Sequence, residues 1–140
     1  MSISKKSIAI VLVFILLLFP FVEVIVVPNW RLQVVNEKGV SLSDELMIQG
    51  WRDYSIEFWF SDTHTEKKST DKNGYVNFPE RTIRVSIAQL ALSELWDFTS
   101  KEIPHTSQGK HSYIVCAKIV KCQASYSEGD ELPKVIIVEE

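Results

Sequence analysis

The residues with the widest chemical range in this sequence are three histidines, His64, His105 and His111. A zinc site needs three or four His, Cys or carboxylate ligands at characteristic spacings, and these histidines show no such spacing with one another or with the cysteines. A serine hydrolase of the common type needs a Gly-x-Ser-x-Gly turn, which the sequence lacks. We therefore predict isolated loop or surface histidines and no catalytic, cofactor or metal site.

A calcium loop is the second chemistry that the sequence raises. With Gly74 counted as position six of an EF-hand loop, Asp71, Asn73 and Glu80 fall at positions three, five and twelve. Position one is Ser69 instead of Asp, and the flanking segments alternate like strands. The pattern therefore favours a polar turn without a bound cation.

The two cysteines, Cys116 and Cys122, form the remaining reactive pair. Outside the cytoplasm, two cysteines usually form a disulfide. Six residues of extended strand span about 20 Å, whereas bridged Cα atoms lie about 5.5 Å apart. The intervening segment contains no Gly, Pro, Asn or Asp to turn the chain, so the sequence leaves the free and bridged states open.

The N-terminus carries the pattern of an export signal. Two lysines precede an apolar run from Ile8 to Val22, and Val24–Val27 extend it beyond Glu23 to about 20 residues, the length that spans a bilayer. Signal peptidase needs small residues before its cleavage site, and none occurs between residues 10 and 29. We expect an uncleaved signal-anchor rather than a cleaved signal, and not a core helix, because the run is apolar all round.

This interpretation sets the domain organisation and the location. Residues 1–28 are expected to form the signal-anchor or transmembrane segment, and residues 29–140 one domain large enough to bury a compact core. Lys5 and Lys6 favour a cytoplasmic N-terminus. The protein is therefore expected in the cell membrane as a single-pass protein with its C-terminal domain outside the cytoplasm.

The charge excludes one class of partner. The chain has 15 basic and 18 acidic residues, and 13 bases and 17 acids remain after Lys5, Lys6 and Glu23 are left out. A domain with this net negative charge is poorly suited to nucleic acid or anionic lipid. The expected partners are therefore the membrane, through the anchor, and an unknown protein or envelope component, but no nucleic acid.

After the N-terminal segment, short β-branched and aromatic runs alternate with turn residues, which indicates a sandwich or barrel. In the run that contains Arg81 and Arg84, the two guanidinium groups are expected on opposite faces as a solvated pair. The predicted strands are Trp30–Val35, Leu46–Tyr54 with alternation continued through Tyr54, Ile56, Phe58 and Phe60, Thr63–Thr70, Tyr75–Phe78, Arg81–Ser86, Tyr113–Val120 and Lys134–Val138.

One segment, Ser86–Phe98, breaks this rhythm. Its apolar residues recur at three- and four-residue spacing, which predicts one short amphipathic helix. The residues expected on its apolar face are Ile87, Leu90, Ala91, Leu95 and Phe98.

Two motifs resemble those of a known domain family. Val34–Gly39 reads Val-Val-Asn-Glu-Lys-Gly, and Thr70–Tyr75 reads Thr-Asp-Lys-Asn-Gly-Tyr, in which Asn73-Gly74 favours a tight hairpin. This order of features, over about half of the folded part, resembles the carboxypeptidase regulatory-like domain of transthyretin-like (prealbumin-like) fold. In the family a proline usually follows the first turn, where this chain has Val40.

The resemblance implies an all-β fold, a seven-stranded Greek-key β-sandwich. With the elements expected from the residues themselves, the predicted fold has one short helix and a preceding N-terminal transmembrane helix. It implies no catalytic residues, since such domains serve as accessory or adhesion modules of secreted and surface proteins. The family's enzymatic cousins, the hydroxyisourate hydrolases, end in Tyr-Arg-Gly-Ser, whereas this chain ends in Ile137-Val138-Glu139-Glu140. That activity is not supported.

We therefore predict a non-catalytic extracytoplasmic binding or structural accessory module, tethered to the membrane by one N-terminal helix. The alternative is a small secreted or anchored hydrolase with a site in the sandwich loops. A cleft that gathers His105, His111 and a carboxylate would favour the hydrolase.

Overall fold

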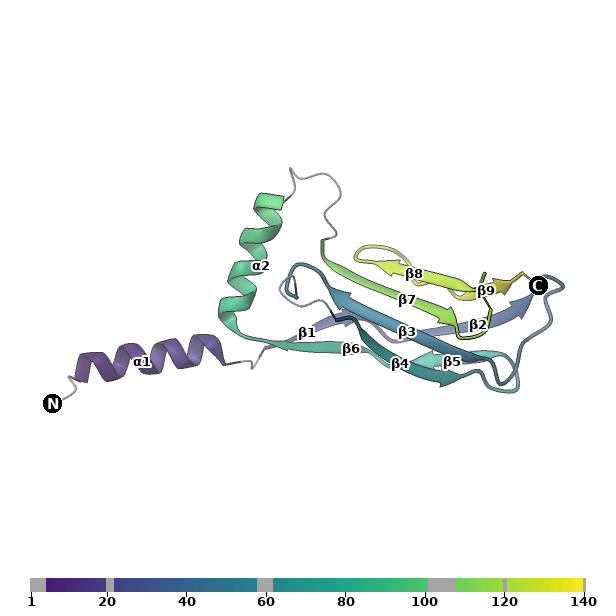
Figure 1. The fold of residues 1–140 in the computed structure, drawn as a ribbon, viewed down its shortest axis with the longest axis horizontal. Helices are drawn as coiled ribbons and strands as arrows, with labels where there is room; N and C mark the ends of the chain where they lie inside the picture. The colour runs from purple at the N-terminus through teal and green to yellow at the C-terminus, as the bar shows by residue number, and fades with distance from the viewer. Residues whose placement is uncertain (1–4, 20–21, 58–61, 101–107, 120, 140) are drawn as a thin grey trace.

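The computed structural model describes residues 5–19, 22–57, 62–100, 108–119 and 121–139 (Figure 1). In these ranges the chain forms two helices and nine strands. In chain order they are α1 (Lys5–Leu18), β1 (Val22–Val27), β2 (Trp30–Asn36), β3 (Leu46–Asp53), β4 (His64–Ser69), β5 (Tyr75–Phe78), β6 (Arg81–Val85), α2 (Ile87–Ser100), β7 (Lys110–Cys116), β8 (Gln123–Ser127) and β9 (Val135–Val138).

Seven of the strands form two larger sheets. In the three-stranded sheet, β2 lies in the middle, antiparallel to β5 and parallel to β9. The four-stranded sheet has the order β4-β3-β7-β8 and is antiparallel throughout. The remaining strands, β1 and β6, pair as an antiparallel ribbon. This mostly β architecture confirms the predicted fold class at the level of an all-β, sandwich-like domain.

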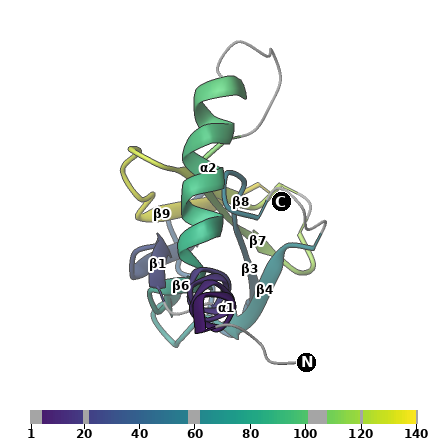
Figure 2. The ribbon, with the colours of Figure 1, turned by 90° about the vertical axis from the view of Figure 1, so that its left-hand side faces the viewer.

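The two larger sheets share one hydrophobic core. On β2, Trp30, Leu32 and Val34 are buried while Arg31 is exposed, which is the pattern of a strand with one face in a core. Figure 2 shows β9 and β1 on one side of the molecule and β3, β7 and β4 on the other. The core's largest fully buried side chains are Trp30, Phe78, Leu32, Met47 and Ile114.

The N-terminal segment differs from the prediction. α1 ends at Leu18, and the chain then forms β1, which pairs with β6 and buries Val26 and Val27. The prediction that Val24–Val27 complete a membrane-spanning helix is therefore wrong, because these β-branched residues favour a strand and find a partner in β6. β1 belongs to the folded part although it lies before the predicted boundary. Within the described ranges, neither helix combines the length and the apolar character needed to cross a bilayer.

The turn at Asp71–Gly74 joins the two sheets. The predicted hairpin is wrong, because β4 pairs with β3 in one sheet and β5 pairs with β2 in the other. The Asp71 carboxylate accepts hydrogen bonds from the backbone N–H groups of Asn73 (2.8 Å) and Tyr75 (2.9 Å), and Gly74 has a φ of +75°. Asp71 thus organises a side-chain-capped turn that carries the chain from one layer to the other.

The predicted alternation from Tyr54 to Phe60 is also interrupted. β3 ends at Asp53, whose carboxylate accepts the backbone N–H groups of Ser55 (3.0 Å) and Ile56 (3.1 Å). These hydrogen bonds start a turn in place of further strand. Phe58 and Phe60 lie outside the described residues.

α2 starts as the sequence predicts but faces the other way. Ser86 Oγ accepts the N–H of Gln89 (3.2 Å), and Gln89 Oε1 accepts the N–H of Ser86 (2.8 Å), which is a capping box. Most of the predicted apolar face, however, points away from the core. Its exposed members are Ile87, Ala91, Leu95 and Phe98.

Candidate functional site

A hollow of about 680 Å³ opens where β4 passes the edge of the three-stranded sheet. Its volume falls within the range of about 300–1,000 Å³ that is typical of small-molecule sites. We name it the Arg31–Lys68 hollow. The side chains that give it its character are Arg31, Lys68, Asp71, Tyr75 and Asn77.

Strand register brings these residues together. Arg31 lies opposite Asn77, and Gln33 lies opposite Tyr75, in the β2–β5 pair. Arg31 is on the outer face of its sheet, where the alternation of β2 leaves it exposed. Lys68 comes from β4, at the facing edge of the other sheet. The hollow therefore depends on the turn that carries the chain between the two sheets.

The electrostatics of the hollow favour an anionic group. The Arg31 guanidinium carbon lies 4.6 Å from the centroid of the Tyr75 ring, a cation–π contact that holds the side chain in place. Lys68 Nζ donates to the backbone carbonyl of Asn77 (3.1 Å) and lies 3.5 Å from Glu66 Oε1. Two cations and the Tyr75 ring line the same hollow, which suits a ligand that carries a carboxylate or similar anion next to a flat or apolar part.

The two motifs of the family resemblance meet beside this hollow. Val34 N–H donates to the carbonyl of Gly74 (2.8 Å), and Gln33 Nε2 donates to the carbonyl of Asn73 (3.0 Å). The Asp71 carboxylate, considered above as a calcium ligand, is engaged with backbone N–H groups of its own turn. No group of three or more His, Cys, Asp or Glu side chains that could hold a metal occurs among the described residues.

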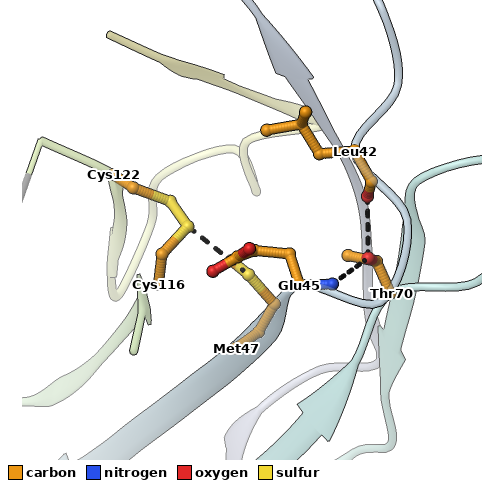
Figure 3. Close-up of a disulfide and its surroundings, with 6 residues drawn as sticks. All are labelled: Leu42, Glu45, Met47, Thr70, Cys116 and Cys122. Carbon is orange, nitrogen blue, oxygen red and sulfur yellow. Dashed lines mark hydrogen bonds between the residues drawn. A yellow bond between two sulfur atoms is a disulfide. The ribbon is translucent and has the colours of Figure 1, made fainter. Parts of the chain in front are cut away.

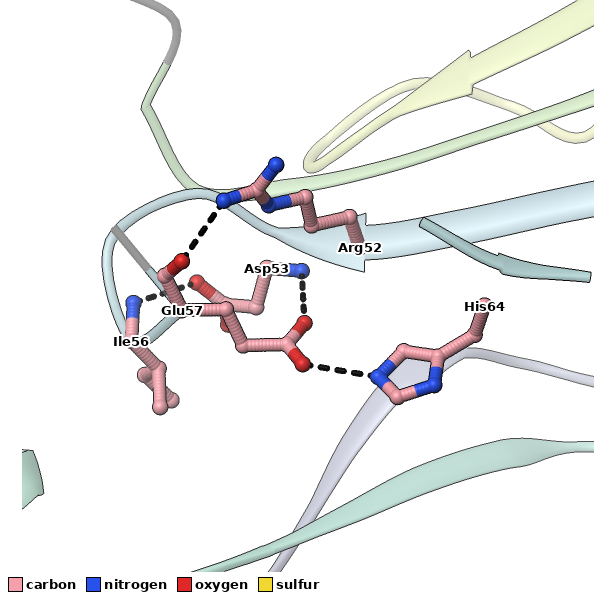
Figure 4. Close-up of polar contacts among 5 residues, drawn as sticks. All are labelled: Arg52, Asp53, Ile56, Glu57 and His64. Atoms are coloured by element: carbon pink, nitrogen blue, oxygen red, sulfur yellow. Dashed lines mark hydrogen bonds and ion pairs between the residues drawn. The ribbon is translucent and has the colours of Figure 1, made fainter. Parts of the chain in front are cut away.

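A second polar cluster lies at the end of β3 (Figure 4). His64 Nε2 lies 2.7 Å from Glu57 Oε1, while Glu57 Oε2 accepts the N–H of Asp53 (3.0 Å). Arg52 donates to the carbonyl of Glu57 (2.7 Å), and the His64 ring stacks on Trp51. The prediction of an isolated histidine is wrong for His64, because the turn after β3 brings Glu57 back to β4.

Asp53 is the buried acid of this cluster, only 3% exposed. Burial raises the pKa of its carboxyl above the ordinary value of 3.8, and the hydrogen bonds from the N–H groups of Ile56 and Ser55 offset part of that rise. Its role is to hold the turn after β3.

Arg81 is buried, which corrects the prediction of a solvated arginine pair. Its Nε donates to Gln49 Oε1 (2.8 Å), its Nη1 lies 2.6 Å from Glu66 Oε2, and its guanidinium lies over the Trp51 ring. The hydrogen bond from Arg81 is the main cause that lowers the pKa of Glu66. The signal was present in the sequence, since Arg81 has the same strand parity as the buried residue Ile83.

His111 lines a smaller hollow of about 240 Å³, together with Tyr54, Tyr113 and Ser127. Its Nδ1 lies 3.1 Å from Ser127 Oγ, and its Nε2 lies 2.7 Å from the carbonyl of Gln108. If Nε2–H donates to that carbonyl, Nδ1 is left to accept the Ser127 O–H. His111 is thus paired with a hydroxyl instead of isolated. His105 lies outside the described residues.

The cysteines form a disulfide, which settles the question that the sequence left open (Figure 3). The Cα atoms of Cys116 and Cys122 lie 5.4 Å apart, and the N–H of Cys116 donates to the carbonyl of Cys122 (3.2 Å). Ala117 N–H donates to the carbonyl of Leu46 (2.8 Å), which holds the chain directly after Cys116 against the start of β3. Both cysteines are buried.

Thr70 forms two hydrogen bonds at the end of the sandwich that carries the disulfide. Its Oγ1 donates to the carbonyl of Leu42 (2.7 Å) and accepts the N–H of Glu45 (3.0 Å) (Figure 3). The first residue of the second motif therefore anchors the loop between β2 and β3.

No protein-family model matches this chain, and no curated protein is significantly similar to it in sequence. The function has to be inferred from the geometry of the described residues. That geometry offers an open cationic hollow, a serine–histidine contact and, at the N-terminus, an apolar helix that the sandwich leaves uncovered.

Proposed function

We propose that this protein is a non-catalytic accessory module that α1 tethers to a membrane and whose β-sandwich binds a partner or ligand outside the cytoplasm. The observation that carries the proposal is α1 itself. Its large apolar side chains from Ile8 to Leu18 are 38–64% exposed, on every side of the helix. A helix that is apolar on every side exposes apolar surface wherever water surrounds it, and insertion into lipid removes that surface from water.

The tether is short and sits close to the sandwich. Fourteen residues of helix extend about 21 Å, against about 30 Å for a bilayer's hydrocarbon core. A short apolar helix is accommodated by partial insertion or by local thinning of the bilayer. Because Val22 of β1 follows Leu18 by only four positions, the sandwich is held directly at the membrane surface.

Two observations support a location outside the cytoplasm. The Cys116–Cys122 disulfide belongs to an oxidising compartment. Lys5 and Lys6 precede the apolar run, and basic residues at that position favour a cytoplasmic N-terminus with translocation of the C-terminal domain.

The proposal includes a transthyretin-like Greek-key sandwich of the carboxypeptidase regulatory-like class. Its support is the seven strands that divide three and four between the larger sheets, and the contact between the two motif turns at Val34 and Gly74. In such a module the Arg31–Lys68 hollow is the place for an anionic group of the ligand.

Membrane fractionation tests the tether. The full chain should stay in the membrane pellet through high-salt and carbonate washes, because hydrophobic burial and not charge holds it there. A Leu12→Asp variant places a charge in the middle of α1 and should shift protein to the supernatant. A matched Glu37→Asp variant on the far side of the sandwich should behave like the parent. A parent chain that leaves with carbonate would overturn the proposal.

A hydrolase is the second candidate, and the Ser127–His111 contact is the observation that favours it. If the protein is a hydrolase, a fluorophosphonate probe should label Ser127. The chain should also hydrolyse esters, and both Ser127→Ala and His111→Gln should abolish that activity. Under the binding proposal, the chain shows neither the labelling nor the activity.

A further inference from the structure

α2 carries an apolar stripe that the described part of the sandwich does not cover. Ile87, Ala91, Leu95 and Phe98 follow one another at spacings of four, four and three residues, so they share one helix face. Ile87 is 44%, Leu95 59% and Phe98 76% exposed. An amphipathic helix normally turns such a face inward, so this one needs a partner.

The opposite face fixes α2 to the sandwich. Leu90 packs against the core, Ser93 is buried, and Asp97 accepts a hydrogen bond from Ser55 Oγ. The capping box at Ser86 ties the start of the helix to the end of β6. These contacts set the rotation of α2 about its axis and therefore the direction in which the apolar stripe points.

The apolar stripe and α1 lie on the same side of the molecule. The two helices contact each other. Figure 2 shows α2 lying crosswise in front of the sandwich, with α1 seen end-on beside it. α2 runs across the direction of α1 (Figure 1). A membrane that took up α1 along its length would therefore lie parallel to α2, on the side of the molecule where α2 is.

The charges on α2 indicate which kind of surface fits. Glu94 and Asp97 are its only charged residues, and Glu94 is exposed beside the stripe. Interfacial helices that bind anionic lipid carry Lys and Arg on their polar face. α2 has neither, so its attraction to a membrane is hydrophobic and does not depend on negatively charged headgroups.

We propose that α2 is an interfacial helix whose apolar stripe lies in the headgroup–acyl boundary of an uncharged phospholipid surface, next to the entry point of α1. The occupant of this face is thus lipid. The inference rests on the proposed tether, since α1 brings α2 to the surface. It adds that the sandwich is held in one orientation. The C-terminal end of β2 and the N-terminal end of β3, which lie farthest from α1, are turned away from the membrane (Figure 1).

Single fluorescent labels on the full chain in phosphatidylcholine vesicles test this orientation. Both native cysteines are in the disulfide, so one introduced cysteine takes a polarity-sensitive nitrobenzoxadiazole label. Leu95→Cys reports on the apolar stripe, Leu12→Cys on the tether, and Val40→Cys on the opposite end of the sandwich. The three sites are similarly exposed, at 59%, 54% and 58%. Phospholipids with a spin label near the headgroup or deep in the acyl chain serve as quenchers.

The expected result is quenching at Leu95 by the shallow quencher, at least about twofold stronger than at Val40, with a blue-shifted emission. Replacing part of the phosphatidylcholine by the anionic lipid phosphatidylglycerol should not strengthen the quenching at Leu95. Quenching at Leu12 with none at Leu95 overturns the α2 inference and leaves the tether standing. Absence of quenching at both sites overturns both. A blue shift at Leu95 that grows with protein concentration, without lipid quenching, identifies a second copy of the chain as the occupant and overturns the inference.

Discussion

Gly74 and Gly39 share a backbone φ of +75° but differ in their surroundings. A Cβ on Gly74 would lie 2.8 Å from the carbonyl oxygen of Val34, whereas a Cβ on Gly39 would meet nothing within 4 Å. We expect Gly39→Ala to cost about 1 kcal/mol, from the positive φ alone, and Gly74→Ala about 2–3 kcal/mol. Urea unfolding of both variants checks this. Equal losses would contradict the close contact between the two motif turns.

Asp53 makes the free energy of unfolding fall as the pH rises, whereas most carboxylates make it rise. Its pKa is raised in the folded state, so the unfolded chain loses its proton first as pH rises above 3.8. The free energy of unfolding of the parent should therefore fall, relative to Asp53→Asn, as pH rises through the raised pKa, and then stay constant. Asn keeps an oxygen for the N–H groups of Ser55 and Ile56. Parallel pH curves for parent and variant would count against the burial of a charged Asp53.

At this scale, alternation located the inward side chains of β2 and β5 correctly, because each strand has one face in the core. The polar partners could not be read in the same way. Glu57 contacts His64, and Ser127 contacts His111, because turns and strand pairs bring these side chains together, and the sequence pattern does not show those turns and pairings. Arg81 could have been placed from its parity with Ile83, but its acceptor on Glu66 depends on the register of another sheet.

Among the elements, β1 decides where the folded domain begins. Its Val26 and Val27 are 1% and 0% exposed, and each such burial contributes about 1.5–3 kcal/mol. A chain that starts at Val22 should therefore be more stable than one that starts at Asn29, by about 3 kcal/mol or more. Thermal and urea unfolding of the two chains, compared by circular dichroism, measure the difference. Two chains of equal stability would show that β1 does not belong to the domain.

The disulfide between β7 and β8 closes a small loop, so its contribution to stability is moderate. For a loop of this size the chain-entropy model gives about 2 kcal/mol. We expect reduction, or joint replacement of Cys116 and Cys122 by Ala, to lower the free energy of unfolding by about that amount while the far-ultraviolet spectrum keeps its strand signal. Complete unfolding on reduction would mean that the bridge, and not the core, holds the four-stranded sheet.

The sequence predicted the elements better than their connections. Period-two runs and turn residues located most of the strands, and the three- and four-residue spacing of apolar residues located α2. The turn at Asp71–Gly74 was misjudged, because Asn-Gly favours a hairpin locally whereas Asp71 caps a turn between sheets. The prediction for Val24–Val27 was wrong because these β-branched residues fit both an apolar membrane-spanning segment and a β-strand. Only the pairing with β6 shows which of these two structures forms.

At the scale of the whole molecule, most of the exposed large apolar side chains belong to the two helices at one end, while a few others, Val40, Val135 and Ile137, lie on the sandwich. α1 and α2 lie at that end (Figure 1). Most of the residues that line the Arg31–Lys68 hollow come from β2, β4 and β5 of the sandwich. This division is what a tethered module needs, with one end for lipid and the rest of the sandwich free for a ligand. Under the proposed tether, a negatively charged domain can lie beside a membrane, since the attachment would be hydrophobic.

Fractionation combined with surface labelling of the native protein tests both the membrane tether and the location of the sandwich outside the cytoplasm. Sealed cells or spheroplasts are treated with a membrane-impermeant amine reagent, and their membranes are then washed with carbonate. We expect the chain to stay in the pellet and the exposed lysines Lys67, Lys72 and Lys118 to be labelled before lysis. A chain recovered in the supernatant, or one whose lysines react only after the cells are broken, would contradict this expectation.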